Sequence, residues 1–366
     1  MRLISTDKCV PGMKLGKSIY NNEGLILLGV KVELNQSLIT RLIKIGIDHI
    51  YIEDSRTDDI IIPDLITDQT RVRAITEIRS SFRKTMDLSN HKKTGLGNYH
   101  LGKTFSNVMS LIIDDLSQNQ DAMIMVMNMN AVDHYLYNHS LSVCIYATML
   151  GISQGYSKDE LMALGIGALL HDIGKTQIPM EILFKSGKLT DEEFTEMKKH
   201  AELGYKILKD EPNISLLTAH CAYQHHERVN GSGYPRGIKG KEIHDYAKWI
   251  GLVDSYDAMT THRVYRAAML PHQALEVLYT GSDTLYDMAM IEKFRDNVAV
   301  YPPGVMVTLH TGAKGVVVSV KTNFPQRPVV RILENEAGER LSVPYEVDLS
   351  QELTAMITSV NDIAVE

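Results

Sequence analysis

The chain has 366 residues, which predicts two or three domains at about 150 residues each. Hydrophobic residues make up 44% of the sequence and charged residues 23%, as in proteins that fold on their own rather than stay disordered. The formal net charge of −7 excludes a broad basic surface for a nucleic-acid polymer, so an anionic ligand has to be bound by a local cluster of basic side chains.

The cysteines and the hydropathy pattern indicate where the protein resides. Cys9, Cys144 and Cys221 are far apart and lack CxxC spacing, which argues against a disulfide framework and a zinc knuckle. No apolar run approaches the roughly 18 residues that span a bilayer, and the first residues lack the apolar segment of a signal peptide. We therefore expect a cytoplasmic protein with no membrane insertion.

The first part of the chain is predicted to be β-rich with one helix. SIYNNEGLILL has two apolar runs around Asn-Asn-Glu-Gly, which predicts a hairpin. NQSLITRLIKIG then has apolar residues at helical spacing, and IDHIYIED alternates like a strand. Polar SRTDD follows, and we predict a small β-rich domain over residues 1–60.

Residues 61–298 have an almost wholly helical pattern. Two helix starts carry capping boxes, in which a hydroxyl precedes a carboxylate by three residues: Ser157 with Glu160, and Thr190 with Glu193. After Tyr301-Pro302-Pro303 the sequence returns to strand patterns in VMVTLHTGAKGVVVSV and RPVVRILENEAGERL. These predict a second small β-rich domain over residues 299–366, and neither end region carries a catalytic constellation.

The helix that begins at Ser157 is predicted to end at HDIGK, with His171 and Asp172 at its carboxyl end. Such a pair alone is weak evidence, because a histidine at a helix end usually just bonds a backbone carbonyl. The same helical region carries five further metal-binding side chains: His139, His200, His225, His226 and Asp254. Imidazole and carboxylate bind iron, manganese or zinc, and seven such groups fill two coordination spheres if one carboxylate bridges.

Asp172 is our candidate for the bridging ligand, because at a helix end it diverges from His171 and one side chain can span both ions. Two ions about 3.5–4 Å apart acidify a shared water and stabilise an in-line phosphoryl displacement. Gly174 would let the chain turn away from the helix. Lys175 would bring a cation to the developing negative charge, although a favourable charge at a helix carboxyl end explains it as well. The helix that begins at Thr190 is expected to carry His200 in its last turns.

Four motifs follow one another in a familiar order: HDIGK with Pro179, ILFKSGKLTDEEFTEMKKHAELG, HHERVNGSGYPRGIKG and LVDSYDAMTTHRVYRAA. Together they resemble the HD-GYP domain, a branch of the HD superfamily of metal-dependent phosphohydrolases. The resemblance is strong from about His134 to Ala268. It implies a multidomain protein whose catalytic core is an all-α HD-type helical bundle over residues 61–298, flanked here by the two small β-rich domains.

The resemblance also implies how the ligands divide between two divalent ions, with iron or manganese as the metals. One ion would be held by His139, His171, Asp172 and Asp254, and the other by Asp172, His200, His225 and His226. Some members bind a third ion through a glutamate four residues before the first histidine, but that position is Tyr135 here, so we predict two ions. His134 is expected to face elsewhere, since a helix rotates by about 100° per residue.

Substrate contacts are predicted from the NGSGYP loop and the THRVYRAA segment. The loop can lay Tyr234 against a purine, or the tyrosine simply packs on the helical core. Arg263 and Arg266 suit a phosphate or a guanine edge and match family positions that contact the dinucleotide, although an ordinary basic face is the alternative. Glu227 is expected to orient a ligand. We predict Asp172 and Lys175 as catalytic residues, and Lys175, Tyr234, Arg263 and Arg266 as substrate-binding residues.

The activity that the resemblance implies is hydrolysis of cyclic di-GMP to pGpG, GMP or both. A hydroxide bridging the metals would attack phosphorus, while the metals and Lys175 stabilise the pentacoordinate state. One alternative keeps this chemistry but changes the substrate to another cyclic dinucleotide, such as cGMP-AMP. Another is a signalling receptor that binds cyclic di-GMP and acts through partner proteins, although the complete ligand set counts against it. Homo-oligomerisation is left open.

Overall fold

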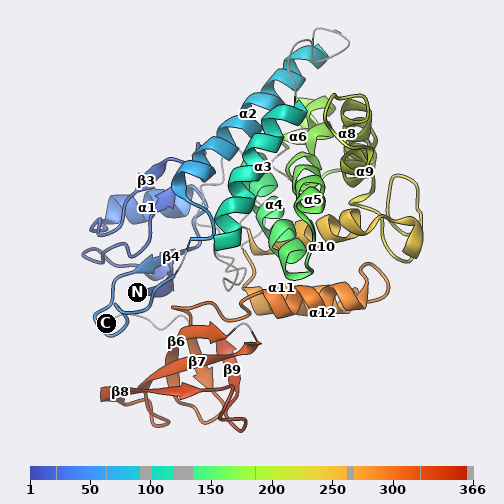
Figure 1. Cartoon of the computed structure of the whole chain (residues 1–366). Helices are drawn as coiled ribbons and strands as arrows, with labels where there is room; N and C mark the ends of the chain where they lie inside the picture. Colours follow the sequence, from blue (N-terminus) through green and yellow to red (C-terminus); the bar gives the residue numbers. More distant parts are fainter. Residues whose placement is uncertain are drawn as a thin grey trace.

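The computed structural model describes residues 1–21, 23–62, 64–90, 101–118, 135–185, 187–261, 268–321 and 323–360. A helical body occupies the middle of the chain, and β-rich segments occupy both ends (Figure 1). This arrangement confirms the fold class predicted from the sequence. None of the helices in the described ranges combines the length and the apolarity needed to cross a membrane.

The amino-terminal segment contains two short antiparallel strand pairs and one helix. The pairs are β1 (Arg2–Ser5) with β4 (His49–Ile52), and β2 (Ile19–Tyr20) with β3 (Ile26–Leu28). The second pair is the hairpin predicted around Asn-Asn-Glu-Gly. Helix α1 (Gln36–Lys44) begins where the side chain of Asn35 accepts a hydrogen bond from the amide of Leu38. Leu15, Ile19 and Ile50 lie in the core of this segment.

The helical body is built from eleven helices in the described ranges and two short 3-10 turns. In chain order the helices are α2 (Asp68–Asn90), α3 (Leu101–Gln118), α4 (Tyr135–Ser153), α5 (Lys158–Leu170), α6 (Met180–Leu183), α7 (Asp191–Lys198), α8 (His200–Leu208), α9 (Leu216–Gln224), α10 (Asp245–Thr260), α11 (Pro271–Thr280) and α12 (Met288–Asn297). The turns are η2 (Ile173–Gln177), after α5, and η3 (Gly240–Glu242), before α10. One hydrophobic core joins these helices apart from α6 and α7, with Phe82, Phe105, Tyr256 and Phe294 fully buried in it.

Both predicted capping boxes are present. Ser157 and Thr190 each accept a hydrogen bond from the backbone of the glutamate three residues later, and that glutamate accepts one from the capping residue in return. They fix the starts of α5 and α7, as the sequence predicted. Helix α7 ends at Lys198, however, and His200 is the first residue of α8. The prediction that His200 lies in the last turns of the helix begun at Thr190 is therefore wrong, because the helix breaks at Lys199.

The carboxyl-terminal segment folds into one antiparallel sheet of five strands. They are β5 (Met306–Leu309), β6 (Lys314–Lys321), β7 (Phe324–Glu334), β8 (Arg340–Asp348) and β9 (Ile357–Val360), in the spatial order β8-β7-β6-β5-β9. The pairs β5–β6 and β7–β8 are the strand pairs that the sequence predicts around glycine-containing turns. Helices α11 and α12 lie between this sheet and the rest of the helical body (Figure 1).

The two β-rich ends of the chain pack against each other. Leu3 and Tyr51 share a hydrophobic cluster with residues of the carboxyl-terminal sheet such as Val317. The guanidinium of Arg331, on β7, donates to both carboxylate oxygens of Asp59 at 2.7 and 2.6 Å. The two β-rich ends therefore contact each other directly, although the whole helical body separates them in the sequence.

Candidate metal centre

The seven predicted ligands come from the ends of three helices and the interior of two others. His171 caps the carboxyl end of α5 and Asp172 follows it, His225 caps α9 and His226 follows it, and His200 begins α8. His139 lies within α4 and Asp254 within α10. The structure gathers all seven into two adjoining groups: Asp172, His200, His225 and His226 form one, and His139, His171 and Asp254 form the other. Within each group the ligand atoms lie within 4.8 Å of one another.

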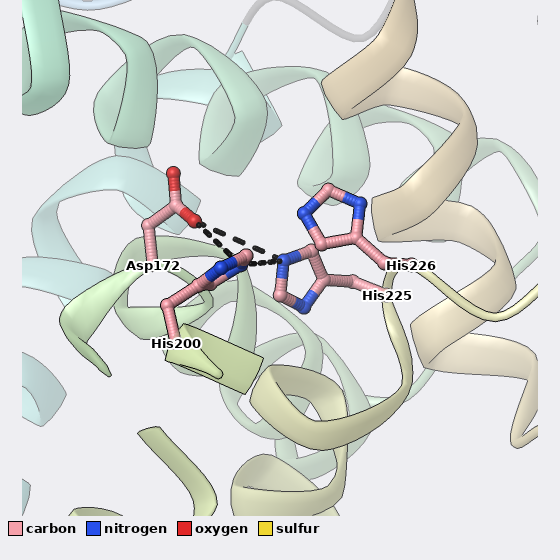
Figure 2. Close-up of side chains that lie close together, drawn as sticks. All are labelled: Asp172, His200, His225 and His226. Carbon is pink, nitrogen blue, oxygen red and sulfur yellow. Dashed lines mark hydrogen bonds and ion pairs between the residues drawn. The ribbon is translucent and has the colours of Figure 1, made fainter. Parts of the chain in front are cut away.

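The carboxylate of Asp172 lies between these two groups. Its Oδ2 is 3.3 Å from Nε2 of His171 and 3.9 Å from Nε2 of His139. Its Oδ1 is 3.5 Å from Nε2 of His200 and 3.8 Å from Nε2 of His225. Figure 2 shows the carboxylate pointing toward the last two rings. Each oxygen thus faces a different group, which is the geometry that a bridging ligand requires.

Backbone carbonyls orient three of the histidines. Nδ1 of His171 lies 2.7 Å from the carbonyl of Ala168, Nδ1 of His200 lies 2.7 Å from that of Met197, and Nδ1 of His225 lies 2.9 Å from that of Ala222. A carbonyl oxygen only accepts, so each Nδ1 carries the hydrogen and donates it. In the neutral ring this leaves a lone pair on Nε2, and all three lone pairs face the centre.

The donor set fits cations. Nε2 of His200 and Nε2 of His225 lie 3.3 Å apart, and with both hydrogens on Nδ1 no hydrogen bond joins them. Nε2 of His171 and Oδ1 of Asp172 are buried and have no hydrogen-bond partner among the described residues. Buried polar atoms are costly without a partner, and a divalent ion between these atoms would supply one to each. The cluster is therefore able to hold metal ions.

The pKa values favour the metal-binding forms of these groups. Burial lowers the pKa of His200 to about 4 and that of His226 well below its usual range, so both rings are neutral at pH 7. Burial raises the pKa of Asp172, but the positive charge of the Lys175 ammonium acts in the opposite direction, and the pKa is held well below its usual value. Nζ of Lys175 lies 2.5 Å from Oδ2 of Asp172. The carboxylate is thus ionised and ready to bind cations.

His139 is held by a residue that the sequence analysis missed. Its Nδ1 lies 2.7 Å from Oδ2 of the fully buried Asp257, and its Nε2 lies 3.0 Å from Oδ1 of Asp254. Burial lowers the pKa of His139, but hydrogen bonds to Asp254 and Asp257 raise it to about 9, so a metal ion that bound at Nε2 would displace a proton. One signal was available, because Asp257 follows Asp254 by three residues and shares its helix face.

Gly174 has a role other than the predicted turn. It does not adopt a positive φ, and a Cβ atom at this position would lie 1.9 Å from the carbonyl oxygen of His200 and 2.5 Å from the amide nitrogen of Gly204. The missing side chain lets η2 pack directly on α8. This contact brings Asp172, from one segment, next to His200, from the other.

The predicted substrate contacts are described in part. The ring of Tyr234 lies 4.6 Å from that of His226, so the NGSGYP loop flanks the metal centre. Arg263 and Arg266 lie outside the described residues, as do His134 and the side chain of Tyr135. Oε1 of Glu227 accepts from the amide of Arg236 at 2.8 Å and closes the loop, and backbone carbonyls orient His225, so an orienting role of Glu227 toward another ligand stays a prediction.

Comparison with known proteins gives two family matches. Residues 123–290 match the HD domain family, and residues 306–364 match the KOW domain associated with HD domain. The chain is 30% identical over 240 residues to a cyclic di-GMP phosphodiesterase of Pseudomonas aeruginosa, covering 64% of this chain and 58% of the relative. It is 35% identical over 158 residues to a 3'3'-cGAMP-specific phosphodiesterase of Vibrio cholerae, covering 43% of this chain and 34% of that one.

A solved structure of an HDG"Y"P protein from Bdellovibrio bacteriovorus aligns with a TM-score of 0.46 and 15% identity, over 80% of this chain and 98% of that one. The chain spans less than two thirds of the length of the two relatives named in the previous paragraph: 58% of the Pseudomonas aeruginosa protein and 34% of the Vibrio cholerae protein. The match over residues 123–290 includes the HDIGK motif and all seven of the buried or half-buried histidines and aspartates, so this segment is similar to the HD domain family.

Proposed function

We propose that this protein is a metal-dependent phosphodiesterase that hydrolyses cyclic di-GMP to pGpG, GMP or both. The observation that carries the proposal is the position of Asp172, which presents one carboxylate oxygen to each of two groups of buried ligands. Such a pair of sites suits two divalent ions, which when bound supply an acidic water and Lewis-acid stabilisation to phosphoester hydrolysis. The similarity to the cyclic di-GMP phosphodiesterase of Pseudomonas aeruginosa supports the substrate.

The ligands divide as the family resemblance implies. One ion would be held by His139, His171, Asp172 and Asp254, and the other by Asp172, His200, His225 and His226. Iron or manganese is our proposal for both ions, although the same imidazole and carboxylate donors also bind zinc.

The chain's own residues supply substrate binding and charge. Lys175 is partly exposed while its ammonium contacts Asp172, so it can also reach a phosphate oxygen bound beside that carboxylate and stabilise the developing charge. Tyr234 flanks the centre and offers its ring to a purine. Arg263 and Arg266 remain predicted contacts to phosphate or guanine.

A second candidate substrate is the mixed cGMP-AMP dinucleotide, which the similarity to the 3'3'-cGAMP-specific enzyme of Vibrio cholerae favours. The chemistry at the metals would be the same, because the two dinucleotides differ in a base and not in the phosphodiester. A receptor that only binds cyclic di-GMP and signals to partner proteins has no need for two complete groups of ligands. The three cysteines are free and buried, which fits the reducing cytoplasm that we propose as the compartment.

The test begins with protein purified without oxygen, whose metal content is measured by elemental analysis. With Mn²⁺ or Fe²⁺ it should convert cyclic di-GMP to products identified by mass, and Asp172→Asn should abolish this. Asp159→Asn, on the exposed first turn of α5, is the control and should keep full activity. Faster cleavage of cGMP-AMP in direct competition would favour the second substrate. Tight binding of cyclic di-GMP without cleavage over hours would favour the receptor.

A further inference from the structure

Helix α7 presents two side chains beside the metal centre that the proposed chemistry does not use. They are Phe194 and Lys198, which are four residues apart and so lie on one face of the helix. Phe194 is 47% exposed although it is a large apolar residue. Single exposed apolar residues are common in soluble proteins, so exposure alone indicates nothing. The contacts that these two side chains make with the rings beside the metal centre are what indicate a role in binding.

The ring of Phe194 extends a row of rings that begins at the metal ligands. Its centroid lies 6.4 Å from that of Tyr234, edge to face, and Tyr234 lies 4.6 Å from His226. A flat group resting against Phe194 would therefore be one ring away from a proposed ligand. This is an arrangement in which a base lies on the outer ring while the phosphodiester of the same nucleotide reaches the centre.

Lys198 adds a positive charge that no carboxylate in the described part of the chain neutralises. Its Nζ lies 5.1 Å from the ring centroid of Phe194 and 6.0 Å from that of Tyr234, and no described acidic group forms an ion pair with it. Nearby lysines do have such partners: Lys185 pairs with Glu193 and Lys199 with Glu196. An unneutralised ammonium over two aromatic rings, next to a centre for phosphoester chemistry, suits a phosphate group.

We propose that Phe194, Lys198 and Tyr234 form the subsite for one purine nucleotide of the substrate. Phe194 stacks on the base and Lys198 binds the phosphate that is not cleaved. The inference rests on the proposed function, since it assumes a dinucleotide at the metal centre. Stacking of a base on an aromatic ring changes affinity by roughly 5- to 150-fold when the ring is removed, because the flat faces lose their contact.

The first test compares hydrolysis kinetics of the full chain with Mn²⁺. Phe194→Leu keeps an apolar side chain but removes the ring, and should raise KM for cyclic di-GMP by roughly 5- to 150-fold with little change in kcat or in metal content. Phe194→Trp keeps a flat face and should hold KM near the wild-type value. The matched control is Phe324→Leu on β7, at a phenylalanine that is 49% exposed in the carboxyl-terminal sheet.

A KM for Phe194→Leu equal to that of the control would overturn the subsite, and so would a Phe194→Trp variant as impaired as Phe194→Leu. Lys198→Gln should raise KM and make it less sensitive to salt, since one ion pair with phosphate is lost. Lys206→Gln, at an exposed lysine paired with Glu202, is its control. Equal salt sensitivity in the two lysine variants would contradict the role of Lys198.

The subsite and the proposed function fail in different ways. If wild-type protein leaves cyclic di-GMP intact, hydrolysis of this substrate is refuted. Calorimetric binding of cyclic di-GMP to the Mn²⁺-loaded protein then still tests the subsite. A dissociation constant that is the same in wild type and in Phe194→Leu, or no binding at all, would refute it.

Discussion

Replacement of Asp257 by asparagine tests the metal centre through a residue that does not itself bind metal. Its Oδ2 accepts from Nδ1 of His139 at 2.7 Å, and the two side chains are 0% and 1% exposed. Asp257→Asn keeps the shape and removes the charge. A hydrogen bond to a charged group contributes about 1.5–3 kcal/mol. Loss of the partner that orients a ligating histidine weakens metal binding by about 10- to 100-fold, or about 1.4–2.7 kcal/mol, so both estimates agree.

The loss should fall on one ion more than on the other, because His139 belongs with His171 and Asp254 and not with the second group. Titration of Mn²⁺ into metal-free protein against a competing chelator resolves the two affinities, and elemental analysis gives the stoichiometry. Asp245→Asn, at a 64% exposed aspartate on the first turn of the same helix, is the control. If Asp257→Asn binds both ions as tightly as the control does, Asp257 does not position His139 and the reasoning is refuted.

Three further predictions concern stability. Gly174→Ala should lower the free energy of unfolding by at least about 1–3 kcal/mol, because the added Cβ would lie 1.9 Å from the carbonyl oxygen of His200. The control is Gly187→Ala, where an added Cβ meets open space. Equal urea midpoints for the two variants would contradict the prediction. Removal of bound metal by a chelator should lower the melting temperature. Adding Mn²⁺ at 100 times its Kd should then raise the free energy of unfolding by about 2.7 kcal/mol. Superimposable melting curves with and without Mn²⁺ would count against a metal site. The hydrogen bond from Arg331 lowers the pKa of Asp59 in the folded protein below the ordinary value of 3.8. This pair therefore stabilises the fold fully above pH 3.8, and its contribution is lost as the pH falls through the folded-state pKa. Asp59→Asn should remove this part of the acid sensitivity, and acid-unfolding curves of equal steepness for variant and wild type would disprove it.

Local sequence signals predicted the elements that carry the site. The capping box at Ser157 placed the start of α5, and the length of its apolar run placed His171 and Asp172 at its carboxyl end. The capping box and the apolar run both belong to a single helix, so one continuous stretch of sequence is enough to predict where that helix begins and ends. The hairpins of the two β-rich ends were predictable for the same reason, because each has its turn in the sequence between its strands.

Contacts between distant segments could not be predicted in this way. Asp257 and His139 are separated by 118 positions, and Arg331 and Asp59 by 272. Periodicity shows which face of an element is apolar but not which other element covers it. The pairing of β1 with β4 and the contact of η2 with α8 at Gly174 were missed for that reason.

The way the histidines are held explains why one of them needs Asp257. His171 and His225 cap the carboxyl ends of α5 and α9, and His200 comes just after the carboxyl end of α7. The last carbonyls of a helix have no partner within it, so at each of these ends a carbonyl is available to accept a hydrogen bond from Nδ1 of the histidine. The carboxyl ends of α5 and α9, which carry the negative ends of the helix dipoles, therefore lie next to proposed ligands and would favour a cation there. His139 lies inside α4, where the helix already uses the backbone carbonyls. Its Nδ1 therefore depends on a side-chain acceptor, and the buried carboxylate of Asp257 is the one that the fold brings to it.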